Sequence, residues 1–267
     1  GGRAVDGSLI GDTPSKPFGG GEELAWGADS RTIFFTLRKA DRDEPTSTNL
    51  DIYQAKVDAR IAPINLTEAN KATDTLPTPS PDGKWLAYAA MARPGYESDR
   101  QVLMLRNLEN GETRKLTDAW DRSVASIAWA PGGKALYVTA QEVLDHPVFR
   151  VDVATGKVER LKASNAATEG NIGDVTPLAD GSLLYARNSI LLPTDIYLRD
   201  AKGKVTQLTD ANAATLAELD PVKVERMQFA GANGDTVWGQ IVKPANATGK
   251  LPVAFLVHGG PQGSFGN

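Results

Sequence analysis

Apolar and polar residues alternate in short runs along most of the chain, separated by turns that contain Pro, Asp or Gly. Such alternation predicts antiparallel strands joined by hairpins. Four stretches share the order apolar strand, turn, apolar strand, and they cover residues 24–37, 78–90, 127–140 and 175–187. They recur about every 50 residues, which indicates a repeat architecture.

A second marker recurs in step with the first. Leu is followed by Thr at 66–67, 116–117 and 208–209, and by Lys at 161–162. Each unit also has room for two further strands around a short polar turn, and four strands in about 50 residues are typical of a β-propeller blade. The alternative all-β fold, a sandwich, does not predict this register. We therefore expect a mainly β chain with four blades, and residues 1–20 as the tail of a preceding blade.

The loops of the predicted blades differ in length. In an up-and-down blade, the loops between the second and third strands share one rim with the connections between blades. The long polar segments at 38–49, 92–100 and 117–124 fall on that rim. Long and chemically varied loops on a rigid scaffold are where binding usually occurs. We therefore expect the functional surface there.

The pattern changes after Pro221, which divides the chain into a propeller part (1–220) and a second part (221–267). Residues 224–244 predict a hairpin around an Asn-Gly-Asp turn. The unbroken apolar run at 251–257 predicts a strand buried on both faces of an α/β sheet. Gly259 and Gly260 follow, and their backbone N–H groups have the freedom to point into an oxyanion hole.

Composition narrows the function classes. The formal net charge is −4 without a basic cluster, which disfavours nucleic acid as a partner. The sequence contains no run of about 18 apolar residues, so it predicts no membrane-spanning helix. The absence of cysteine excludes disulfides and thiolate metal sites but does not fix the compartment. The first residues lack Met and a leader pattern, so we expect any targeting segment upstream and both ends of the sequence to be cut.

The motifs SPDGKWLAY, RPGYESDR, LTDAWDRS and TPSKPFGG, followed by HGGPQGSFGN, resemble the prolyl oligopeptidase family of serine peptidases. The similarity extends over essentially the whole chain and is strongest to the dipeptidyl-peptidase V and acylaminoacyl-peptidase branch. It implies a propeller that caps an α/β-hydrolase domain with a Ser-Asp-His triad, short peptides as substrates and no cofactor. It also implies that the backbone around Gly259 and Gly260 contributes to the oxyanion hole, and it favours a periplasmic or secreted protein over a cytoplasmic one.

The triad itself is missing from the sequence. No G-x-S-x-G elbow is present, and Ser264 in GSFG lacks the spacing and the strand-to-helix context of a nucleophile. Of the two histidines, His146 falls at the start of a predicted strand, and His258 is better placed to brace the glycine loop than to act as a base. We therefore expect the triad beyond residue 267 and no peptide hydrolysis by these residues alone.

Glu97 is the leading candidate for substrate binding. A peptidase that removes dipeptides must recognise a free α-ammonium group, and a carboxylate on the propeller rim would pair with it. Arg93 and Tyr96 could shape the same pocket. The alternative is a solvated glutamate held by Arg93 or Arg100.

Other polar clusters have structural interpretations. Trp120, Asp121 and Arg122 predict a turn between blades with a local ion pair, and a contact to a hydrolase domain is the alternative. The carboxylates of Asp41, Asp43 and Glu44 lack further ligands at metal-binding spacing, so a solvated loop is favoured over a metal site. The strand aromatics are expected in the propeller core, and they are Trp26, Trp85, Tyr88, Trp129 and Tyr137.

Two functions from different classes remain. The first is a part of a serine exopeptidase that releases dipeptides or acylated residues, with further blades and a hydrolase domain as its intramolecular partners. The second is a non-enzymatic TolB-like propeller that binds a protein. The second leaves the hairpin and the HGGP segment unexplained.

Overall fold

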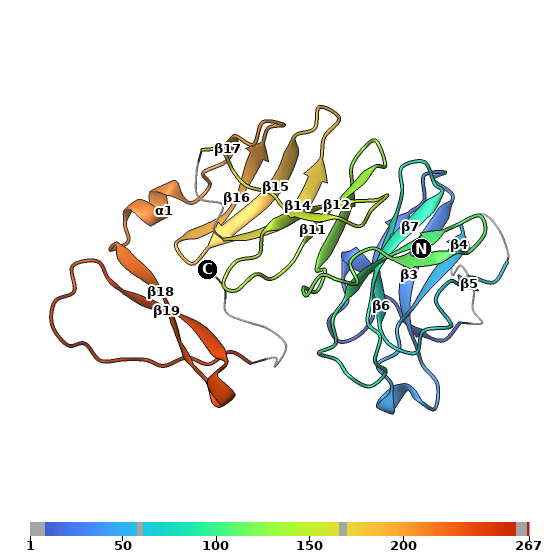
Figure 1. Ribbon diagram of the computed structural model, residues 1–267, viewed down its shortest axis with the longest axis horizontal. Helices are drawn as coiled ribbons and strands as arrows, with labels where there is room; N and C mark the ends of the chain where they lie inside the picture. Colours follow the sequence, from blue (N-terminus) through green and yellow to red (C-terminus); the bar gives the residue numbers. More distant parts are fainter. Residues whose placement is uncertain (1–8, 58–60, 166–169, 260–265, 267) are drawn as a thin grey trace.

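The structure is a computed structural model that describes residues 9–57, 61–165, 170–259 and 266. Four antiparallel sheets follow one another along the chain and lie side by side, with a two-stranded hairpin after them (Figure 1). Within each sheet the strands are hydrogen-bonded in the order in which the chain forms them, apart from an added strand in the first. The sheets are consistent with propeller blades, and we number them blades 1 to 4.

The strand bounds agree with the predicted repeat. Blade 1 contains β1 (Gly11–Asp12), β2 (Leu24–Trp26), β3 (Thr32–Lys39), β4 (Asp51–Lys56) and β5 (Ile64–Asn65). Blade 2 contains β6 (Asp74–Pro79), β7 (Trp85–Ala90), β8 (Val102–Asn107) and β9 (Thr113–Lys115). Blade 3 contains β10 (Ser126–Trp129), β11 (Ala135–Thr139), β12 (Val148–Asp152) and β13 (Val158–Arg160). Blade 4 contains β14 (Asn171–Pro177), β15 (Leu183–Ser189), β16 (Leu192–Arg199) and β17 (Val205–Gln207).

Aspartates in the turns between the first two strands explain why those turns form. Asp29 Oδ1 accepts hydrogen bonds from the backbone amides of Arg31 and Thr32 at 3.0 and 2.8 Å, so the side chain replaces backbone partners within the turn. The carboxylate of Asp82 accepts from the Lys84 amide in the same way. Gly83 follows at a φ of 70°, a conformation that glycine adopts without steric cost.

The hydrophobic core lies between neighbouring blades. Alternation places one apolar face of each sheet against the next sheet. One cluster joins blades 1 and 2 around Phe34, Ile52 and Leu86, and a larger one joins blades 2 and 3 around Leu105 and Leu136. A third cluster joins blades 3 and 4 through Val148, Ile172, Leu183, Tyr185 and Tyr197.

The predicted rim is confirmed by contacts between its loops. The loop between β3 and β4 contains a short 3₁₀ helix, η2 (Glu44–Thr46), and meets the connection between blades 1 and 2 where Thr73 Oγ1 donates to Thr48 O at 2.8 Å. It also meets the loop between β7 and β8, since the Gly95 amide donates to Thr48 Oγ1 at 2.9 Å. Long loops of adjacent blades therefore share one edge of the molecule.

The start of the described chain corrects one expectation. Residues 9–20 do not belong to a separate preceding blade, because Gly11 and Asp12 pair with Lys39 and Arg38 at the end of β3. Strand β2 pairs only with residues 33–35 of β3, which leaves the end of that edge open for β1. The 3₁₀ helix η1 (Gly21–Glu23) then leads into β2, and residues 1–8 lie outside the described residues.

The aromatic side chains are not all in the core. Tyr88 and Trp129 are buried and Trp85 and Tyr137 are partly buried, whereas Trp26 is 62% exposed, so its assignment to the core is wrong. Trp129 reaches the preceding blade, where its Nε1 donates to Thr78 O at 2.8 Å. Trp26 occupies the corresponding position in blade 1, and no described blade lies on that side of it.

The predictions for residues 221–267 are confirmed only for the hairpin. Helix α1 (Ala213–Ala217) leads to the predicted hairpin, which consists of β18 (Val222–Ala230), the 3₁₀ turn η3 (Ala232–Gly234) and β19 (Thr236–Pro244). The buried strand expected at 251–257 is absent, and Phe255 is 81% exposed. An apolar run becomes a buried strand only when neighbouring strands and covering helices surround it, and none of the described residues provides them. No helix among the described residues is long and apolar enough to cross a membrane.

Candidate functional site

The candidate site is the loop between β7 and β8, residues 92–100, which we call the rim loop. Asp99 holds its two ends together, because Oδ2 accepts from the amides of Ala92 and Arg93 at 2.8 Å each. Asp99 Oδ1 also pairs with Arg93 Nε at 3.0 Å. Burial by itself raises the pKa of Asp99, but the hydrogen bonds from the two amides and from Arg93 outweigh it and hold the pKa below the usual value.

The middle of the rim loop is held by an aromatic contact. The guanidinium carbon of Arg93 lies 3.9 Å from the ring centroid of Tyr96, a cation–π geometry. A hydrogen bond from Ser98, together with the positive charge of Arg93, lowers the pKa of Tyr96. Arg93 and Tyr96, both predicted to line a binding pocket, are thus brought together, and they stack on each other at the surface.

The far end of the rim loop is attached to the connection between blades 2 and 3. Arg100 donates to the carbonyl oxygens of Thr117, Asp118 and Trp120. Trp120 packs edge-on against Phe149 with ring centroids 4.7 Å apart, and Arg122 pairs locally with Asp121 at 2.7 Å. The structural interpretation of this Trp-Asp-Arg segment is therefore confirmed.

Among the three candidate residues of the rim loop, Glu97 is the one whose side chain has no partner among the described residues. It is exposed, and no hydrogen bond or ion pair joins it to any described side chain. The alternative in which Arg93 or Arg100 holds Glu97 is wrong, because Arg93 pairs with Asp99 and Arg100 with carbonyls and Asp118. The loop is thus fixed by its neighbours and presents a carboxylate that is available to a cation.

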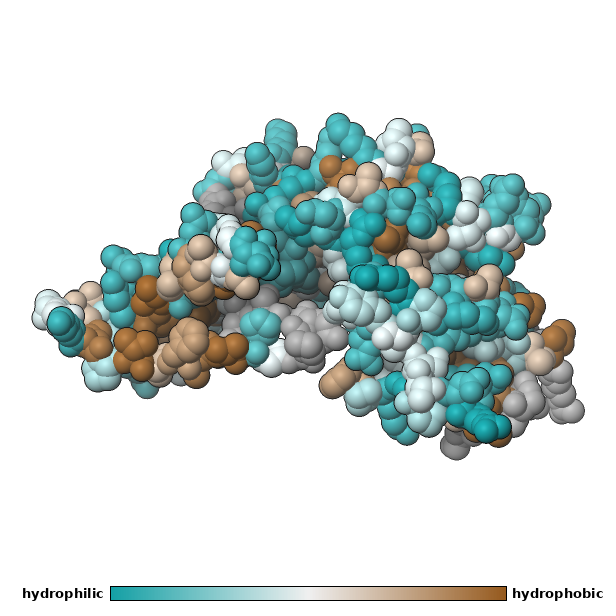
Figure 2. Space-filling view, turned by 60° about the horizontal axis from the view of Figure 1, so that its bottom comes forward, coloured by the Kyte–Doolittle hydropathy of each residue, from teal (hydrophilic) through white to brown (hydrophobic). Residues whose placement is uncertain are grey.

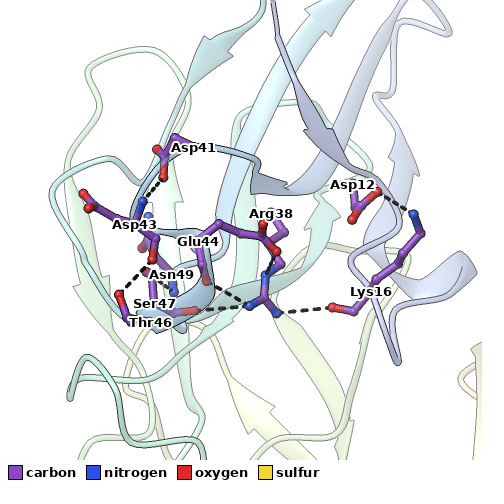
Figure 3. A network of polar contacts seen from close by, with 9 residues as sticks. All are labelled: Asp12, Lys16, Arg38, Asp41, Asp43, Glu44, Thr46, Ser47 and Asn49. Atoms are coloured by element: carbon purple, nitrogen blue, oxygen red, sulfur yellow. Dashed lines mark hydrogen bonds and ion pairs between the residues drawn. The ribbon is translucent and has the colours of Figure 1, made fainter.

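A polar cavity of about 280 Å³ lies on blade 1, joined to the rim loop through Thr48. Arg38 organises the loop around it, since Nη2 donates to Glu44 O at 3.2 Å and Nε lies 3.4 Å from Glu44 Oε1 (Figure 3). Nη1 reaches across to Lys16 O at 3.3 Å. The lining residues carry both charges: Arg38, Lys39, Asp41, Asp43, Glu44, Ser47, Asn49, Asp51, Tyr53, Asn65, Glu68 and Lys71.

The acidic residues in this loop bind the loop itself. Asp41 Oδ1 accepts from the Asp43 amide at 3.0 Å, which lowers the pKa of Asp41, and Asp41 also pairs with Lys39 at 3.4 Å. Glu44 pairs with Arg38. Within the described ranges, no group of three His, Cys, Asp or Glu side chains is placed to hold a metal ion.

The glycine segment is described only up to its first glycine. Gly259 is exposed, with open space where a side chain would stand, and His258 Nδ1 lies 3.0 Å from Gly259 O. Gly260 and Ser264 lie outside the described residues, so their predicted roles are not tested. Burial lowers the pKa of His146, which sits two residues before β12.

Three features were not found from the sequence. They are the bracing of the rim loop by Asp99, the cavity on blade 1, and an ion pair between Asp145 and Arg226 at 2.8 Å. The sequence around Asp99 does not indicate its partners, because those partners are backbone amides at the other end of the loop. The ion pair joins residues 81 positions apart, a separation that no local pattern encodes.

Taken together, the sheets define a segment consistent with a β-propeller that carries a braced rim loop with an exposed carboxylate. The chain is homologous to dipeptidyl-peptidase 5. It is 30% identical to the protein of Porphyromonas gingivalis over 257 residues, which is 94% of this chain and 36% of that protein. It is 32% identical to the protein of Porphyromonas endodontalis over 266 residues, which is 98% of this chain and 37% of that protein. The resemblance predicted from the blade motifs is therefore confirmed.

Solved structures support the fold. An acylaminoacyl peptidase in complex with Z-Gly-Gly-Phe-chloromethyl ketone matches 85% of this chain and 33% of its own, with a TM-score of 0.65 and 22% identity. A putative TolB from Agrobacterium tumefaciens matches 70% of this chain and 64% of its own, with a TM-score of 0.56 and 17% identity. No family model matches the chain. The chain thus spans little more than a third of its peptidase relatives.

Proposed function

We propose that this chain is the propeller part of a serine exopeptidase that releases dipeptides or acylated residues from the N-terminus of short peptides. Homology to dipeptidyl-peptidase 5 over nearly the whole chain supports this proposal. The observation that carries it is the carboxylate of Glu97, which has no partner among the described residues and stands on a loop fixed at both ends. The proposed chemistry is acyl transfer to water through a serine acyl-enzyme.

In this proposal the two parts of the sequence have different roles. Residues 1–220 form blades that gate access, and residues 221–267 begin an α/β-hydrolase domain whose triad lies beyond the sequence shown. The backbone N–H groups of Gly259 and Gly260 stabilise the oxyanion that develops on the scissile carbonyl. Apolar side chains along the hairpin are exposed (Figure 2), as expected of a surface that such a domain covers.

Glu97 would recognise the substrate by charge. The α-ammonium group of an unblocked peptide pairs with its carboxylate, and the backbone of the rim loop is already fixed, so little loop entropy is lost on binding. The cation–π pair of Arg93 and Tyr96 keeps the guanidinium on the neighbouring ring, away from Glu97. Removal of one charge-assisted hydrogen bond costs about 1.5–3 kcal/mol, which is roughly a 10- to 100-fold loss of affinity.

The experiment compares two substrate classes in the full-length protein. Glu97→Gln is expected to lower kcat/KM by about 10- to 100-fold for dipeptide substrates with a free amino group and to leave N-acylated ones nearly unchanged. Glu112→Gln, which removes an exposed carboxylate from the turn between β8 and β9 on the opposite rim, is the matched control. Equal losses on both substrate classes would remove the ammonium-binding role, and absence of any serine-dependent hydrolysis would refute the peptidase.

A second candidate function is a non-enzymatic propeller that binds a protein partner. The match to the putative TolB, which covers 64% of that chain, favours it. A reactive fluorophosphonate probe separates the two, because only a serine hydrolase becomes covalently labelled. A full-length protein that stays unlabelled and captures a protein partner through its rim would favour the scaffold.

A further inference from the structure

The hairpin β18–β19 is attached to blade 3 by an ion pair between Arg226 and Asp145. Arg226 Nη2 lies 2.9 and 2.8 Å from the two carboxylate oxygens of Asp145. Asp145 belongs to the loop between β11 and β12, and its Oδ1 also accepts from the Gly170 amide just before β14. One carboxylate thereby links blade 3, the start of blade 4 and the hairpin.

Burial distinguishes this pair from ordinary surface pairs. The side chain of Asp145 is 6% exposed and that of Arg226 is 34% exposed. A carboxylate at this depth is stabilised by a charged partner, and removing one partner of a buried ion pair is destabilising. The other ion pairs of the hairpin in the described region stay within it, where Glu225 meets Lys223 and Lys243.

The same loop of blade 3 also receives a later part of the chain. A side chain added at Gly266 would lie 3.0 Å from Leu144 O and 3.1 Å from Asn171 Oδ1, so the backbone of Gly266 lies against this loop. The region after residue 221 therefore returns to the position of Asp145. Elsewhere the hairpin presents exposed apolar side chains, which are Val222, Met227, Phe229, Val237, Trp238, Ile241 and Val242.

We propose that the Asp145–Arg226 pair is a latch that fixes the orientation of the hairpin, and of the chain that follows it, relative to blades 3 and 4. With the pair intact, Asp145 is compensated and the hairpin is held at one angle. With the pair broken, the hairpin is expected to rotate about the segment that contains α1, while the blades keep their own hydrogen bonds. This inference does not depend on the proposed peptidase function.

The test measures the position of the hairpin directly. The chain has no cysteine, so Ala154→Cys in blade 3 and Ala232→Cys at the hairpin tip, both exposed, provide two clean sites for spin labels. Distance distributions from double electron–electron resonance are compared for the labelled chain, Asp145→Asn, Arg226→Met and the double variant. We expect one narrow distribution in the parent chain and a broader, shifted one in each variant.

Controls separate the latch from general damage. Glu225→Gln breaks the ion pairs within the hairpin and is expected to keep the narrow distribution. A single variant can fail to fold because one charge is left buried. The double variant contains neither charge, so it then provides the test, after circular dichroism has shown that it has the native sheet content. An unchanged narrow distribution in the folded double variant would overturn the proposal.

Discussion

The hydroxyl oxygen of Thr117 accepts a hydrogen bond from the backbone amide of Leu103 at 2.9 Å, while the amide of Leu116 donates to the carbonyl of Leu103 at 2.8 Å. The Leu-Thr marker of the sequence thus extends the ladder between the last two strands of blade 2. Blades 1 and 4 repeat the contact, from Ile52 to Thr67 and from Ile196 to Thr209, at 2.9 Å each. The marker recurs because it completes the outer edge of a blade.

Thr117→Val is expected to destabilise the protein by about 1–2 kcal/mol, because the buried amide of Leu103 loses its acceptor while the side-chain volume is retained. Thr117 is 2% exposed, so water cannot replace the hydroxyl without rearrangement. Urea unfolding measures the change. Thr117→Ser retains the hydroxyl and serves as the control. A Val variant as stable as the parent, with the loss confined to the Ser variant, would show that packing of the methyl group, and not the hydrogen bond, stabilises the edge.

Blade 3 offers the converse substitution. Leu161 donates to the Val148 carbonyl at 2.9 Å as in the other blades, but the next residue is Lys162, which has no hydroxyl to accept from the Val148 amide. Lys162→Thr is expected to raise the free energy of unfolding by about 0.5–1 kcal/mol. Lys162→Val tests the contribution of β-branching alone. A Val variant as stable as the Thr variant would contradict the hydrogen-bond explanation.

The four blades could be predicted because each is built from local hairpins whose turns and apolar alternation are visible in the sequence. The turn contacts of Asp29, Asp82 and Asp180 are made to backbone amides two residues further along the chain. The conformation of the run at 251–257 could not be predicted in the same way. Its apolar character shows that the segment can be buried, but not that neighbouring elements are present to bury it. Trp26 is exposed for the same reason. The sequence around Trp26 matches that around Trp129, but no described blade covers Trp26.

The candidate site was predicted at the level of the loop but not of its interactions. Loop length and chemical variety pointed to residues 92–100, and the structure shows that this loop is fixed to a loop of blade 1 and to the connection between blades 2 and 3. The sequence could not distinguish which arginine would engage which carboxylate. Arg93 is two positions closer to Glu97 than to Asp99, yet it pairs with Asp99, because that carboxylate also satisfies two backbone amides.

The indole of Trp129 links blades 2 and 3 through its hydrogen bond to Thr78 O. Trp129→Phe removes the donor and leaves a partly buried carbonyl with one partner fewer, for an expected loss of about 1–2 kcal/mol, and Trp129→Ala should cost about 3–5 kcal/mol through the cavity it creates. Trp26→Phe is the matched control at the corresponding exposed position and should change stability by less than about 0.5 kcal/mol. Thermal unfolding measures all three, and equal effects of Trp26→Phe and Trp129→Phe would contradict the interblade role.

Asp74 is a buried carboxyl group at the junction of blades 1 and 2. It is 1% exposed; Oδ1 accepts from Asn70 Nδ2 at 3.0 Å, and Oδ2 has no hydrogen-bond partner within the described residues. Burial is the main cause that raises its pKa to about 7, with the nearby charge of Asp51 adding to the increase and hydrogen bonds from Asn70 and Thr67 opposing it. The group is therefore protonated in the folded protein well above the pH at which it ionises in the unfolded chain.

This difference makes stability depend on pH. An unfolded aspartate has a pKa of about 3.9, so from about pH 4 to pH 7 the folded state holds a proton that the unfolded state has lost. The contribution of Asp74 is thus fully present below about pH 4, declines as the pH rises and levels off above pH 7. Asp74→Asn removes the titration while keeping an oxygen that can accept from Asn70. From pH 5 to pH 8, the variant should gain about 3 kcal/mol relative to the parent protein.

Urea unfolding of both proteins at pH 5, 6.5 and 8 measures this gain, and the difference between them cancels the titration of all other groups. Asp220→Asn, at an exposed position before the hairpin, controls for the loss of one negative charge and should give a difference that does not change with pH. If the difference between Asp74→Asn and the parent stays constant from pH 5 to pH 8, Asp74 is ionised in the folded protein throughout this range. Its carboxylate would then need a compensating partner at the junction of the blades, because an unpaired buried charge is too costly to retain.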